Sequence, residues 1–89
     1  MRMTDPKNVL ADVAEIIEQR AKTHGDFQDN FKMTAALWSA YLEVDITASQ
    51  VAVLNILQKV SRDQSSENAN EDNLNDATGY AAIAAALQK

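Results

Sequence analysis

The chain has 89 residues, 46% of them hydrophobic and 24% charged, which suits one small folded domain and not a disordered chain. It contains no cysteine, which excludes disulfides and thiolate metal sites and favours the cytoplasm over an oxidising compartment. The formal net charge is −5 and no basic cluster interrupts the acidic residues, which argues against binding to duplex nucleic acid.

The first helix is predicted at about residues 6–22. Asp5 can cap its N-terminus, and Pro6 fits the first helical position, where no backbone donor is needed. Apolar residues recur every three or four positions from Val9 to Ile17, and Gly25 is the expected break. Acidic residues interrupt this region, so it lacks the apolar core of a signal peptide. No segment reaches the roughly 20 apolar residues that span a bilayer, so no membrane partner is expected.

The second helix is predicted at residues 27–42, with Asp26 as its N-cap. One broad face is expected to form the centre of the core, because large rings bury the most apolar surface. Its members are Phe27, Phe31, Thr34, Leu37, Trp38, Tyr41 and Leu42.

The third helix is predicted at about residues 48–62, where Thr47 and Gln50 can form a capping box. It is apolar nearly all round up to Leu57, which suits a helix surrounded by neighbours. Residues 63–70 are polar and are predicted to be a mobile loop.

The fourth helix is predicted at about residues 71–88, and its alanine-rich segment permits close approach of another backbone, within the chain or across a homodimer. The four helices make the expected fold class all-α: a four-helix bundle-like single domain of residues 1–89, expected to be a dimer.

Two groups of polar residues allow both a structural and a functional interpretation. His24, Asp26 and Asn30 surround the first turn, where a histidine is usually solvated or makes a local hydrogen bond. Lys59 and Arg62 end the third helix, where cations complement the helix dipole but could equally contact a phosphate. The spacing alone does not choose between these interpretations.

The fourth helix begins with Asp72, Asp76 and Tyr80 at every fourth position, on one stripe. The helix dipole accounts for Asp72 at the N-terminus. It does not account for Asp76, a like charge one turn later. Mg²⁺ bound by both carboxylates would turn that repulsion into an attraction.

These residues lie within segments that resemble an uncharacterised family of small phage and prophage helical proteins, which implies the cytoplasm of a bacterial host cell. The resemblance rests on residues Arg20 to Asp26, Asn30-Phe31, Leu37 to Leu42, Lys59 to Arg62 and Asp72 to Ala82.

The order of elements is more distantly similar to the MazG-like all-α nucleotide pyrophosphohydrolases. That resemblance implies Mg²⁺ held between two helices, with Asp76 and Asn73 matching the second motif and Asp72 supplying a further carboxylate. The chain departs from the pattern on the third helix, where paired glutamates are replaced by Asn55, Gln58, Lys59 and Arg62.

The hypotheses divide at this departure, and the sequence does not decide whether the protein is an enzyme. In a Mg²⁺-dependent pyrophosphohydrolase, Asp72 and Asp76 would be the metal-binding and catalytic residues. The substrate-binding residues would then be His24, Asp26, Asn30, Lys59, Arg62 and Tyr80. The same groups could instead bind a nucleotide without hydrolysing it, or form a structural polar network. The alternative from another class is a non-catalytic phage accessory protein that acts through protein–protein interaction, with a host protein as partner.

Overall fold

The computed structural model describes residues 5–65 and 72–88. All the regular secondary structure in these ranges is helical: α1 (Pro6–His24), α2 (Phe27–Leu42), α3 (Ala48–Ser65) and α4 (Asp72–Leu87). Of the segment predicted as a mobile loop, residues 63–65 belong to α3, which corrects that part of the prediction. Residues 66–70 lie outside the described ranges. None of the described helices has the length and hydrophobicity needed to cross a membrane.

The helix N-termini are held by the side chains that the sequence predicts. Asp5 and Asp26 each accept, through Oδ1, a hydrogen bond from the backbone amide two residues later, at 2.9 and 2.8 Å. At the start of α3, the Thr47 amide donates to Gln50 Oε1 at 2.9 Å and the Gln50 amide donates to Thr47 Oγ1 at 3.1 Å. Three of the four helix starts are therefore confirmed as local, sequence-encoded features.

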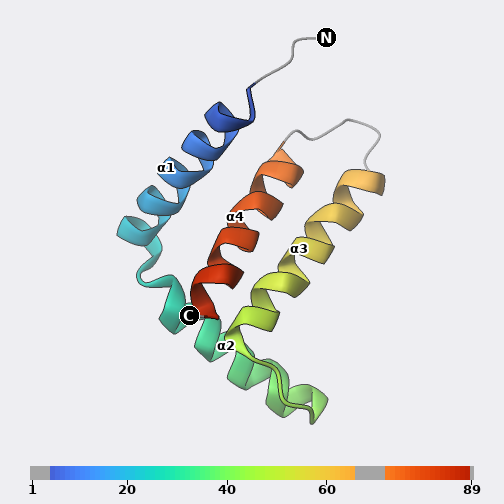
Figure 1. The fold of residues 1–89 in the computed structure, drawn as a ribbon. Helices are drawn as coiled ribbons and strands as arrows, with labels where there is room; N and C mark the ends of the chain where they lie inside the picture. Colours follow the sequence, from blue (N-terminus) through green and yellow to red (C-terminus); the bar gives the residue numbers. More distant parts are fainter. Residues whose placement is uncertain (1–4, 66–71, 89) are drawn as a thin grey trace.

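α3 and α4 form an antiparallel pair, and α1 lies along the side of α4 that faces away from α3. α2 crosses the end of this pair where α3 begins and α4 ends (Figure 1). Ala77 and Ala84 are buried, and Ser49 Oγ on α3 donates to the Ala84 carbonyl at 3.0 Å. The close helix pair that the alanine-rich segment predicts is therefore present within the chain.

The core is small, because most of its buried side chains are short: Val13, Ala35, Val51, Ala52, Ala77 and Ala84. The prediction that the whole broad face of α2 is central is wrong for its last part. Leu37 and Tyr41 are 62% and 87% exposed, whereas Trp38 is half-buried. Leu37 and Trp38 differ by about 100° around the helix axis, and the inward side of α2 is the one that carries buried Ala35 and half-buried Trp38.

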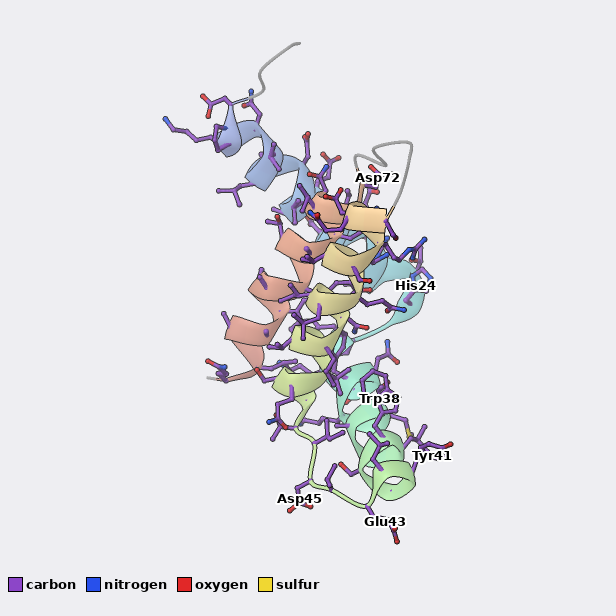
Figure 2. All side chains as sticks on the ribbon, turned by 90° about the vertical axis from the view of Figure 1, so that its right-hand side faces the viewer. His24, Trp38, Tyr41, Glu43, Asp45 and Asp72 are labelled. Carbon is purple, nitrogen blue, oxygen red and sulfur yellow. The ribbon has the colours of Figure 1, made fainter. Side chains whose placement is uncertain are left out.

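Leu42 is also exposed, in the last turn of α2. Figure 2 shows Tyr41 pointing away from the molecule near this end of the helix. α2 thus presents apolar side chains on two sides, and only one of them faces the core.

Candidate functional site

A cavity of about 540 Å³ is lined by residues of all four helices, mostly from α1, α2 and α4. We call it the central pocket. Its volume lies within the range of about 300 to 1,000 Å³ that is usual for small-molecule sites. Its apolar side carries the rings of Phe27, Phe31, Trp38 and Tyr80. Phe31 and Tyr80 are in tilted contact, with ring centroids 6.3 Å apart and planes at 52°.

Three asparagines from three helices line the polar side of the central pocket: Asn30 on α2, Asn55 on α3 and Asn75 on α4. Asn30 Nδ2 donates to the His24 carbonyl at 3.2 Å, which ties α2 to the end of α1. An amide side chain offers a donor and an acceptor side by side. This is the pattern that matches the edge of a nucleobase.

Asp76 lines the same pocket and is paired with a lysine from the neighbouring helix. Its Oδ2 lies 3.1 Å from Lys59 Nζ, with the two side chains 27% and 17% exposed, respectively. The pair joins α4 to α3. Asp76 thus has a positively charged partner on α3. Only its repulsion from Asp72 was evident from the sequence.

The turn between α1 and α2 brings His24 to the margin of the pocket. His24 Nδ1 lies 2.8 Å from Thr23 Oγ1, within a local hydrogen bond. Gly25 has φ 81° and ψ −168°, a conformation that side chains strongly disfavour, so glycine is needed to make this turn. Asp26 then serves as the cap of α2.

The structure thus brings together five of the eight predicted site residues: His24, Asn30, Asp76 and Tyr80 line the pocket, and Lys59 is paired with Asp76. Asp26, Arg62 and Asp72 are not among the described residues that line it. Arg62 is exposed in the last turn of α3, and Asp72 is exposed where α4 begins. Figure 2 shows Asp72 near that end of the molecule, away from Trp38.

The donor set is a poor fit to a protein cage for Mg²⁺. Within residues 5–65 and 72–88, no three histidine, aspartate or glutamate side chains gather to hold a metal ion. One oxygen of Asp76 already faces the Lys59 ammonium group, which offsets its charge. Mg²⁺ normally needs one or two carboxylates together with substrate phosphates. Mg²⁺ on Asp72 and Asp76 therefore stays a prediction.

Sequence reasoning did not select Arg20, Trp38, Asn55 or Asn75 as site residues, yet all four line the central pocket. Two of them carried a signal, because Arg20 continues the apolar stripe of α1 and Asn55 interrupts an apolar run in α3. A polar residue on a buried face needs a polar partner, and that requirement marks a candidate site.

Comparison with known proteins gives a family match over nearly the whole chain. Residues 8–88 match the family described as a domain of unknown function, DUF6378. The Gene 55 protein of Mycobacterium phage L5 is 38% identical over 84 residues, which cover 91% of this chain and 53% of that protein. The Gene 55 protein of Mycobacterium phage D29 is 36% identical over 76 residues, which cover 84% and 50%. The chain thus spans about half the length of these curated relatives. No solved structure is significantly similar to it.

Proposed function

We propose that this chain, which belongs to the DUF6378 family and is related to phage Gene 55 proteins, binds a nucleotide and is of MazG-like ancestry. The family match and the relatives carry no stated activity, so the proposal of nucleotide binding rests on the pocket. The observation that carries the proposal is the composition of the central pocket. Aromatic rings, three amides and the basic side chains of Arg20 and His24 line one cavity large enough for a nucleotide.

In this proposal the base lies against the rings of Phe31 and Tyr80, because stacking on aromatic side chains suits any nucleobase. The asparagine amides contact the polar edge of the base. The phosphates lie toward Arg20, whose planar guanidinium can donate two parallel hydrogen bonds to phosphate oxygens. The negative net charge of the chain makes such local cations necessary for binding an anion.

Hydrolysis to a monophosphate and pyrophosphate is a separate expectation that comes from the MazG-like resemblance. The central pocket has the groups to bind a nucleotide. The pairing of Asp76 with Lys59 leaves less negative charge for a metal than two unpaired carboxylates would. Nucleotide binding and nucleotide hydrolysis therefore need separate measurements.

Trp38 provides a direct assay, because it is the only tryptophan of the chain and it lines the central pocket. Nucleoside mono-, di- and triphosphates are titrated while its fluorescence is recorded, once with EDTA and once with Mg²⁺, and pyrophosphate release is followed in parallel. We expect saturable quenching and a rise in the unfolding temperature with at least one nucleotide.

Arg20→Gln should weaken nucleotide binding about tenfold by removing the proposed phosphate contact. Lys22→Gln is the matched control, because Lys22 carries the same charge on the same helix but is not among the described pocket-lining residues. Equal losses in the two variants would indicate only a general charge effect. No quenching and no thermal shift with any nucleotide would refute the proposal.

The alternative function, a non-catalytic accessory protein that binds a host protein, is supported by a different observation. Large apolar side chains are exposed on α3 as well as on α2, including Leu54 and Leu57. Exposed apolar patches commonly mark protein–protein contacts. Co-purification from host cells that is abolished by Leu57→Glu but unaffected by Arg20→Gln would favour this function over nucleotide binding.

A further inference from the structure

The positive charge that the central pocket offers to a phosphate comes mainly from one side chain. Among the lysines and arginines of residues 5–65 and 72–88, only Arg20 lines the pocket. His24 also lines it, but a histidine carries a full positive charge only in acidic solution. Among the acidic residues of the same ranges, only Asp76 lines it. This part of the lining therefore holds one permanent cation and one carboxylate.

Lys59 does not add a second free cation. Its Nζ lies 3.1 Å from Asp76 Oδ2, and both side chains are largely shielded from water. The pair is neutral as a whole. A phosphate that drew Lys59 away would leave the Asp76 carboxylate without its partner in the lining, which costs free energy. The pair therefore offers a ligand almost no net charge, and Arg20 is the permanent cation that remains.

The margin of the pocket beside His24 does not supply further net charge. Lys22 and Asp26 each lie two residues from His24, both are exposed, and their charges are opposite. Arg62 is exposed and is not among the described lining residues. The protein as a whole has a net charge of −5, which repels an anion. A chain of phosphates longer than the reach of Arg20 would therefore meet repulsion that the described lining does not offset.

The negative charge of a nucleotide grows with its number of phosphates, whereas the charge of the lining is fixed. A phosphate monoester carries a charge of about −1.5 to −2 at pH 7, and two of its oxygens match the two parallel N–H groups of one guanidinium. Each further phosphate adds a negative charge that the Asp76 carboxylate repels and that the same two N–H groups cannot bind. One arginine therefore suits one phosphate.

We propose that, without a divalent metal, the central pocket selects nucleoside monophosphates over the di- and triphosphates of the same base, with Arg20 binding the single phosphate. This inference rests on the proposed nucleotide binding and names the ligand class. Mg²⁺ bound to the phosphates of a triphosphate cancels part of their charge. Adding Mg²⁺ therefore narrows the preference without changing the affinity for the monophosphate.

Isothermal titration in EDTA can compare the nucleosides and the 5′-mono-, di- and triphosphates of adenosine, guanosine, cytidine and thymidine. For the base that binds best, we expect the first phosphate to raise the affinity about tenfold and the triphosphate to bind about fivefold more weakly than the monophosphate. Equal or tighter binding of the triphosphate in EDTA would overturn this inference and leave the proposed nucleotide binding intact. No binding of any of these compounds would refute both.

The role of Arg20 has its own test. Arg20→Gln should make the monophosphate bind no more tightly than the nucleoside, because the variant lacks the guanidinium that distinguishes them. Lys22→Gln, the matched control, should keep the tenfold difference. Circular dichroism shows whether each variant is folded. A folded Arg20→Gln protein that still prefers the monophosphate over the nucleoside tenfold would overturn the assignment of Arg20.

The electrostatic cause of the preference can be tested at Asp76. In EDTA, Asp76→Asn should strengthen binding of the triphosphate about twofold more than binding of the monophosphate, because the repulsion that it removes grows with the charge of the ligand. Asp12→Asn is the control, since Asp12 is exposed and is not among the described lining residues. Equal gains for the two nucleotides in Asp76→Asn, or the same difference in Asp12→Asn, would overturn this cause.

Discussion

Lys59 and Asp76 form an ion pair at the lining of the central pocket, and their separation of 3.1 Å decides how Asp76 can act. A carboxylate beside an ammonium group lowers the positive potential that a phosphate would otherwise meet. Since both side chains are largely shielded from water, the pair is screened less than an exposed one. Asp76 therefore acts in the central pocket as the counter-ion of Lys59.

Replacing Asp76 by asparagine separates this role from metal binding. We expect Asp76→Asn to strengthen nucleotide binding in EDTA, on the order of fivefold, because it removes a negative charge from the lining of the pocket that receives the phosphates. Isothermal titration measures the affinity. A loss of binding that appears only with Mg²⁺ present would instead assign Asp76 to a metal, and a loss in EDTA would contradict the counter-ion role.

The same substitution should lower the free energy of unfolding by about 1 kcal/mol, since it leaves a largely buried cation without its partner. Urea unfolding with Lys59→Met and the double variant isolates the coupling between the two side chains.

At the scale of elements, the sequence was most informative about helix ends and least informative about helix faces. Asp5, Asp26 and the Thr47–Gln50 box act on backbone groups a few residues away, so their roles depend on local spacing alone. Which side of α2 faces the core depends on where the other helices pack. Neither the exposed position of Leu37 nor the pairing of Lys59 with Asp76 could be derived without that packing.

Asp26 illustrates the difference, because it was predicted as a substrate-binding residue and the structure gives it a capping hydrogen bond at 2.8 Å. We expect Asp26→Ala to lower the free energy of unfolding by about 1 kcal/mol, and Asp26→Asn by only a few tenths, because asparagine caps helices equally well. Urea denaturation measures both values. If Asp26→Asn abolished nucleotide binding while the protein stayed stable, Asp26 would contact the ligand after all.

At the scale of the whole molecule, α1 is held to the core by few buried side chains. Val13 is the one buried residue of α1, and the helix as a whole packs mainly against α4 (Figure 1). The central pocket lies partly under its second half, where Ile17, Arg20 and Ala21 line the cavity. A helix with few buried contacts opens at lower free energy than the rest of a fold. Ligand entry would therefore require little disruption of the α3–α4 pair.

Hydrogen exchange followed by mass spectrometry can test this distribution of stability. Amides of α1 should exchange faster than those in the middle of α3 and α4, and a bound nucleotide should slow exchange mainly in the second half of α1. Lys22→Gln protein with the same nucleotide serves as a positive control, and Arg20→Gln protein should show a smaller effect. Uniform protection of all four helices would contradict a loosely held α1.

Neighbouring residues of α2 have different surroundings. Trp38 lines the central pocket, whereas its neighbour Leu37 is 62% exposed. Inherited substitutions should therefore accumulate more slowly at Phe31 and Trp38, which line the pocket, than at the exposed positions Met33 and Leu37.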